Sequence, residues 1–148
     1  MSGTKAGGRS DVARTAHAGR RLVLAAVFEA EFGQRTPEAI LERHLAEVEG
    51  DQGTAEFARA LVAIVVARRA EIDALIERTA PRYPVVQLAR MDRSLLRCAV
   101  GEVLHSASTP ARVAIAEWVD LARTYSGDPA RRLMNGVLGK IDRDRPGD

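Results

Sequence analysis

Residues 131–141 read RRLMNGVLGKI and carry two local signals that disagree. Apolar residues recur at spacings of three and four, as on one face of an α-helix, at Leu133, Met134, Val137, Leu138 and Ile141. Asn135-Gly136 lies among them, and this dipeptide is one of the strongest turn signals in proteins. The rest of the sequence has to decide whether the stretch is a helix or a turn.

The composition favours a helical protein. Hydrophobic residues make up 46% of the 148-residue chain and aromatic residues only 4%, so Ala, Leu, Val and Ile must build the core, which favours helices over sheets. The length is enough for one domain with one core. A single cysteine, Cys98, is consistent with a reducing compartment. We find neither an apolar run long enough to span a membrane nor a secretory signal, and we expect a cytoplasmic protein.

The pattern along the chain predicts six or seven helices in one all-α domain of residues 10–145, after a disordered basic arm of residues 1–9. Three pairs are expected to start helices by one device, a capping side chain followed by proline: Thr36-Pro37, Thr109-Pro110 and Asp128-Pro129. Thr54 is expected to cap a long third helix that runs through Ile76. Residues 85–106 form either one helix or a short and a long one. No period-two pattern indicates a strand.

The sequence offers no arrangement that catalysis or metal binding requires. His17, His44 and His105 are isolated from one another and from Cys98, so no metal-ligand spacing exists. Cys98 lies within an apolar helical pattern, where a buried packing role is expected. No glycine-rich loop follows a strand to cradle a phosphate. We therefore expect a protein that is not an enzyme and that uses no metal or cofactor.

The formal net charge of +2 hides an uneven distribution. Residues 1–21 hold five basic residues and one acid. Within the first helix Arg14, His17 and Arg21 share one side, and Arg20 flanks His17. A row of cations attracts phosphates, and arginine also stacks on unpaired bases. Composition alone favours the simpler interpretation, a solvated helix face, so an RNA-binding face is one of two hypotheses at this point.

Three segments, taken in order and spacing, resemble the NusB family of bacterial transcription antitermination factors. The most specific is TPARVAIAEWVDLARTYSGDPARRLMNGVLGKI, residues 109–141, which contains the family's Val-x-Ile-x-Glu and Asn-Gly-Val-Leu elements. The second is YPVVQLARMDRSLLRCAVGEVL, similar to the family's segment around Val-Asp-Arg, and the third is the arginine-rich ARTAHAGRRLVLAAVFEAE. The resemblance covers almost the whole chain beyond about residue 13.

This resemblance implies an all-helical fold of two packed bundles. It also implies binding to the boxA element of nascent RNA together with NusE, a ribosomal protein that also serves the transcription elongation complex. RNA in the family runs along the first helix toward the start of the last one, which assigns RNA contacts to Arg14, His17, Arg20, Arg21 and Arg132. The family's NusE-facing surface corresponds to Phe28, at the aromatic end of the first helix, and to Asp92 of the Val-Asp-Arg element.

The resemblance also places Asn135-Gly136 inside a helix. We expect Gly136 to allow close approach of a neighbouring group, at a cost of about 1 kcal/mol relative to alanine. Asn135 is interpreted as a buried side chain that pins the last helix, with RNA contact as the alternative. Arg97 is expected to be structural and the role of Arg93 stays undecided, with Glu102 or Glu117 as possible partners.

Several positions depart from the family pattern. Leu133 replaces a phenylalanine, so an aromatic side chain that can stack on a base is absent there. Tyr83 stands where tryptophan is usual, Ala116 replaces an asparagine, and His17 stands where arginine is common. These departures leave the base contacts open and affect the expected RNA contacts more than the expected fold.

Two hypotheses compete with a free-standing RNA-binding adaptor. The same helical domain resembles the N-terminal module of a ribosomal-RNA cytosine methyltransferase, where it serves an enzyme. The chain ends in DRDRPGD without a glycine-rich cofactor loop, which favours the adaptor. In the other hypothesis the protein forms a homodimer that buries the first-helix face and hides it from RNA.

Overall fold

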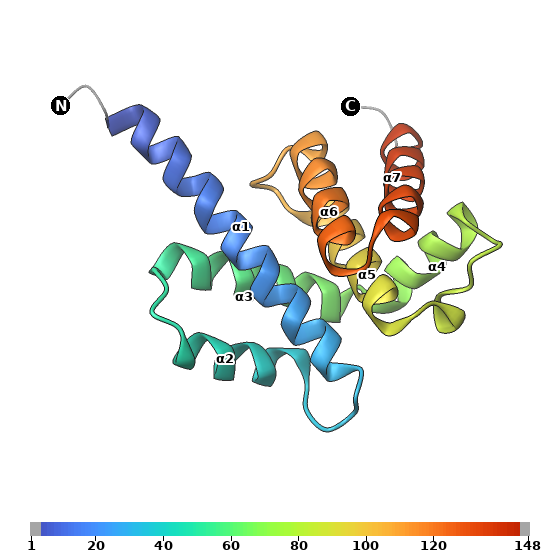
Figure 1. Cartoon of the computed structure of the whole chain (residues 1–148), viewed down its shortest axis with the longest axis horizontal. Coiled ribbons are helices and arrows are strands. Elements are labelled where there is room, and N and C mark those ends of the chain that lie inside the picture. The colour runs from blue at the N-terminus through green and yellow to red at the C-terminus, as the bar shows by residue number, and fades with distance from the viewer. Residues whose placement is uncertain (1–3, 146–148) are drawn as a thin grey trace. The chain divides into compact units, whose positions relative to one another are not determined.

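The computed structural model describes residues 4–145, with side chains from residue 11 onward. Within that range the chain forms α-helices and one 3-10 helix (η1) and no strand, which confirms the predicted all-α class (Figure 1). The elements are α1 (Thr4–Ala30), α2 (Pro37–Glu47), α3 (Gln52–Ala67), α4 (Arg69–Thr79), η1 (Val85–Gln87), α5 (Arg90–His105), α6 (Ala111–Tyr125) and α7 (Asp128–Arg143). None of the helices in the described range is both long and apolar enough to cross a lipid bilayer.

The first helix starts earlier than the sequence pattern predicts. It begins at Thr4, so residues 4–9 of the expected disordered arm are helical, and residues 1–3 lie outside the described range. Glycine in a helix interior costs about 1 kcal/mol, which weakens a helix without forbidding it, so the Gly-rich segment is compatible with a continued α1.

The chain divides into two compact units, Met1–Ala63 and Ile64–Asp148. In the first unit α1 packs on α2 (Figure 1). Aliphatic side chains from all three helices are buried in this unit, among them Val23, Leu24, Ile40, Leu41, Leu61 and Val62. Gly19 allows α3 to come close, because a Cβ there would lie 2.5 Å from Cδ1 of Phe57.

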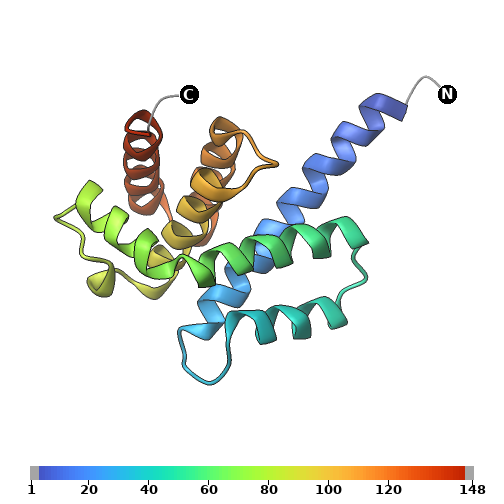
Figure 2. The same ribbon diagram turned by 180° about the vertical axis from the view of Figure 1, so that it is seen from behind.

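The second unit is built around α5, which is buried over most of its length. α6 packs on α5 and α7, and α4 also packs on α5, as the reverse view shows (Figure 2). Trp118 of α6 is fully buried, and its Nε1–H donates to Oε1 of the equally buried Glu102 at 2.7 Å. This bond satisfies two polar groups that are costly to bury alone.

The boundary between α3 and α4 corrects the expected long third helix. The helix breaks at Arg68, whose ψ of 13° departs from the α-helical value, and α4 begins at the next residue. The start of α3 also differs from the prediction, because Asp51 and not Thr54 is the cap. Oδ1 of Asp51 accepts a hydrogen bond from the backbone N–H of Thr54 at 2.7 Å. That hydrogen bond lowers the pKa of the Asp51 carboxyl below its ordinary value.

Helices begin at all three expected Thr/Asp-Pro pairs, but only one pair supplies the predicted capping side chain. Thr36 caps α2, with its Oγ1 accepting from the backbone N–H of Ala39 at 3.1 Å. α6 begins after Pro110 without a side-chain cap. α7 begins after Gly127, whose φ of 112° suits glycine and disfavours other residues. Residues 85–106 resolve into η1 and α5, the second of the two arrangements expected.

The opening stretch is helical, as the resemblance implied, but its two central residues behave differently from expectation. Asn135 is exposed, so it does not pin the helix from a buried position. A Cβ at Gly136 would meet nothing within 4 Å, so no neighbouring group requires a glycine there. Gly136 instead borders an open groove, which is described below.

Candidate nucleic-acid interface

The basic face of α1 presents two exposed arginines. Arg14 has 72% of its side chain exposed and pairs with Asp11 one turn earlier on the helix. Arg21 is exposed and His17 is half-buried, and both also have interaction partners within the molecule. Because ion pairs on an exposed helix surface are weak, the charge of Arg14 stays available to an anion.

Arg20 differs from its neighbours on the same helix. It is only 2% exposed, and its guanidinium carbon lies 5.3 Å from the centre of the Phe57 ring. That distance falls within the range of a cation–π interaction between an arginine and an aromatic ring. The expectation of a direct RNA contact by Arg20 therefore changes: the guanidinium is committed to the interior of the protein and connects α1 with α3.

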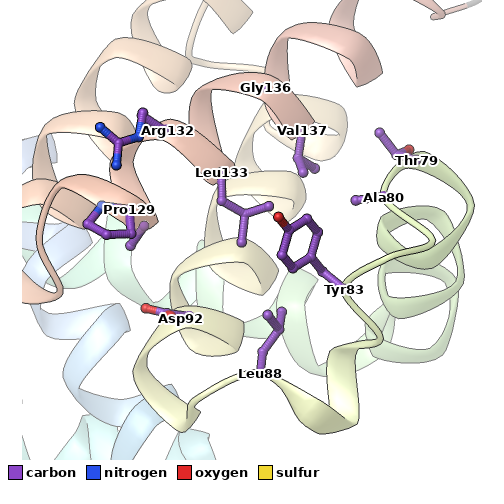
Figure 3. A pocket seen from close by; sticks show the side chains of 11 residues that line it. Thr79, Ala80, Tyr83, Leu88, Asp92, Pro129, Arg132, Leu133, Gly136 and Val137 are labelled. Carbon is purple, nitrogen blue, oxygen red and sulfur yellow. The ribbon is translucent and has the colours of Figure 1, made fainter.

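Arg132, the cation expected at the start of the last helix, is exposed on α7. It borders a groove of about 620 Å³ formed by α7, the start of α5 and the segment that joins α4 to α5 (Figure 3). Within residues 11–145 its side chain forms no hydrogen bond or ion pair, unlike that of the neighbouring Arg131, which pairs with Asp128. The guanidinium is therefore open to a ligand.

Asp92, one of the two residues expected to face NusE, borders the same groove. Its Oδ1 accepts a hydrogen bond from the Oγ–H of Ser126 at 2.5 Å, and its side chain is half-buried. The structure thus brings Asp92 and Arg132 together along one groove, although the sequence assigned them to different partners. Phe28, the other expected NusE contact, lies in the first unit, half-buried and packed edge-on against Phe32.

Arg97, expected to be structural, and Arg93, whose role the sequence left undecided, both make contacts that hold the fold together. Arg97 is buried and makes a two-pronged ion pair with Asp73, from Nε and Nη2 at 2.8 and 2.9 Å. Sequence reasoning did not name Asp73 as its partner. Arg93 donates from Nη1 to the carbonyl oxygens of Val86 and Leu88, each at 3.3 Å, and so holds the segment before α5.

The histidines and the single cysteine, the residue types that metal or redox chemistry requires, do not assemble into a site within residues 4–145. Within residues 4–145, no three His, Cys, Asp or Glu side chains are grouped so that they could hold a metal ion. Cys98 is fully buried, and burial raises the pKa of its thiol far above the ordinary value. A thiol held in its neutral form is a poor nucleophile.

Sequence reasoning missed Tyr83 as a site residue. The residue was noted only as a departure from the family pattern, yet it lines the groove opposite Leu133 and is 51% exposed (Figure 3). A signal was present in the sequence, because an aromatic residue between two prolines is placed in a loop, where large apolar side chains are often functional.

The chain is similar to known proteins over most of its length. A family model described as the NusB family matches residues 17–143. The transcription antitermination protein NusB of Symbiobacterium thermophilum is 38% identical over 136 residues, covering 86% of this chain and 89% of that protein. Its counterpart in Dehalococcoides mccartyi is 35% identical over 124 residues, covering 84% and 87%.

Solved structures show the same fold. NusB of T. maritima superposes with a TM-score of 0.81 at 30% sequence identity, covering 87% of this chain and 91% of that one. A structure of the antitermination factors NusB and NusE in complex with double-stranded RNA has a TM-score of 0.78 at 23% identity, covering 88% and 97%. The second likeness concerns the fold alone.

Proposed function

The chain belongs to the NusB family, whose members are transcription antitermination factors and not enzymes, and we propose that it binds boxA-type RNA together with the ribosomal protein NusE. In this role it acts within the transcription elongation complex and supports ribosomal-RNA transcription. The observation that carries the proposal is the exposure of Arg14 and Arg21 on one side of α1. The solved relative with NusE and double-stranded RNA supports both kinds of partner.

The structure refines which residues are proposed to contact RNA. Arg14, His17 and Arg21 on α1 and Arg132 on α7 are at least partly accessible, and we assign them to the RNA. Arg20 is assigned a positioning role through Phe57. Phe28 and Asp92 remain the proposed contacts for NusE, because both are half-buried and offer part of their surface to a partner.

Binding measurements on charge-reversal variants test this proposal. Fluorescence anisotropy of a labelled boxA-like RNA is expected to show binding that NusE strengthens, since two linked weak surfaces add their effects. Arg14→Glu combined with Arg21→Glu should reduce the affinity by more than about tenfold at low salt, because each reversal removes an attraction to phosphate and adds a repulsion.

The matched control is Arg123→Glu. Arg123 is an exposed arginine that pairs with an acid three residues earlier, Asp120, as Arg14 pairs with Asp11. It lies on α6, outside the proposed surfaces, and its reversal should leave RNA affinity nearly unchanged. Equal losses in the double variant and the control, or unchanged binding in both, would contradict the assignment of RNA to α1. Light scattering in the same samples reports whether a homodimer accompanies or prevents binding.

A further inference from the structure

The groove beside α7 has an aromatic ring on one wall and aliphatic side chains on the other. Tyr83 approaches from the segment after α4, and Leu133 and Val137 face it from α7 (Figure 3). The volume of about 620 Å³ lies within the range of small-ligand sites, roughly 300–1,000 Å³. Gly136 adds no side chain to the α7 wall, where a Cβ would find only open space.

The segment that carries Tyr83 is held in place by the protein itself. Oε1 of Glu77 accepts from the backbone N–H of Val85 at 3.2 Å, and Arg93 binds the carbonyl oxygens of Val86 and Leu88. The backbone N–H of Tyr83 itself donates to the carbonyl of Ala80 at 3.0 Å. An exposed ring on a fixed segment loses little conformational freedom when a flat group stacks on it.

The Tyr83 ring favours a ligand with a flat part, and the charge of Arg132 favours one that also carries a negative group. Arg132 stands at the rim with its guanidinium uncommitted in the described part of the chain. Asp92 borders the groove too, with Oδ1 bonded to Ser126, and its negative charge keeps an anion on the side of Arg132. A purely apolar side chain would use the ring and the aliphatic wall but leave this arginine without a role.

We propose that the groove binds one unpaired nucleobase of the RNA, stacked on Tyr83, with the adjoining phosphate on Arg132. Aromatic stacking together with an arginine is how proteins bind single-stranded nucleic acid. Tyr83 then provides the ring that is missing at position 133, from the opposite wall of the groove. The inference rests on the proposed RNA binding and adds to it Tyr83, a residue that the resemblance did not assign to RNA, as the partner of a base.

The test compares three variants of the full-length protein, using a labelled boxA-like RNA without NusE. Tyr83→Ala should lower the affinity on the order of tenfold, whereas Tyr83→Phe keeps the ring and should stay within about twofold. Tyr125→Ala is the matched control, because Tyr125 is an exposed tyrosine of the same unit that does not line the groove. Circular dichroism confirms that each variant is folded.

Abasic substitutions in the RNA separate stacking from a structural effect of the mutation. Removing the base at each position in turn should identify one position at which wild-type protein loses on the order of tenfold in affinity. Tyr83→Ala should be insensitive to base removal at that position and respond like wild type elsewhere. A merely structural role of Tyr83 would not produce such a position-dependent coupling.

Three results would overturn the inference. If Tyr83→Ala binds as tightly as wild type, or loses affinity equally at every abasic position, no base stacks on Tyr83. If the variant weakens only the assembly that contains NusE, the groove holds a protein side chain and not a base. If wild-type protein binds no RNA with or without NusE, the proposed function fails as well, which distinguishes that outcome from the first two.

Discussion

Arg20 of α1 and Arg132 of α7 belong to the same predicted RNA-binding set, yet their surroundings are opposite. Arg20 is 2% exposed and lies against the ring of Phe57. Arg132 is exposed, at the rim of a groove that also contains an aromatic residue, Tyr83. One arginine is used to assemble a helical unit and the other is available to a ligand. The family resemblance assigned RNA contacts to both arginines, so burial is what separates their roles.

The position of Arg20 within the helical repeat explains its burial. Val23, Leu24 and Val27 are buried and lie three, four and seven residues after it, on the same side of α1. Arg14 and Arg21 lie away from this stripe. Helical periodicity, applied to Arg20 together with these three aliphatic residues, therefore predicts an interior arginine from the sequence alone.

The largest expected effect concerns another interior arginine, Arg97. Arg97→Ala leaves Asp73 without its partner, and breaking a buried ion pair costs about 3–5 kcal/mol. Asp73 is 26% exposed, so solvent partly compensates and the lower end of that range is expected. Urea unfolding followed by circular dichroism measures the change in the free energy of unfolding. A loss below about 1 kcal/mol would show that this pair is not part of what stabilises the second unit.

Gly19→Ala is expected to destabilise by about 1–3 kcal/mol, because the added methyl group would meet the Phe57 ring at 2.5 Å. The same change disturbs the ring on which Arg20 rests. Combining Gly19→Ala with Phe57→Leu tests this cause, since a smaller side chain makes room for the methyl group. If the cost of Gly19→Ala is the same in both backgrounds, the ring is not the obstacle.

Arg20→Met keeps most of the aliphatic bulk and removes the charge over Phe57. A loss of about 1–2 kcal/mol in unfolding free energy is expected, the size of a desolvated cation–π interaction. Arg132→Met, the counterpart on α7, should leave stability within about 0.5 kcal/mol, as for surface substitutions generally. Thermal denaturation of the two variants side by side measures the contrast, and equal losses would remove the distinction between the two arginines.

Gly136→Ala should raise the free energy of unfolding, unlike the destabilising changes above, and by a smaller amount. No atom lies within 4 Å of the added Cβ, and alanine is favoured over glycine in a helix interior by up to about 1 kcal/mol. Stabilisation is therefore expected in chemical unfolding. The added methyl group also borders the groove, so RNA affinity measured in parallel shows whether the space over α7 is used by the ligand.

Local signals in the sequence were sufficient for most helix boundaries and for the fold class. Thr36 followed by Pro37 gave the start of α2, and the aliphatic repeat gave the helical core of each unit. The break at Arg68 was not predictable, since Ile64, Ile72 and Ile76 keep a helical period across it. The spacing of apolar residues shows which side of a helix is buried. It does not show where a single residue departs from helical geometry.

The candidate site was harder to predict because it depends on contacts between distant segments. Asp92 and Arg132 are forty positions apart in the chain, and nothing local links them to Tyr83. Gly136 was expected to be a point of close approach, but the helix simply tolerates glycine beside an open groove. The family resemblance placed the expected residues, and only the packing of α7 against the α4–α5 segment grouped them.

The most direct test of the contrast between interior and accessible arginines is the salt dependence of RNA binding by wild type, Arg21→Gln and Arg20→Gln. Each lost phosphate contact reduces the slope of log affinity against log salt concentration by about 0.7 for single-stranded RNA. We predict this reduction for Arg21→Gln and an unchanged slope for Arg20→Gln, whatever its effect on stability. A slope reduced equally by both changes would contradict the assignment, because Arg20 would then contact the RNA directly.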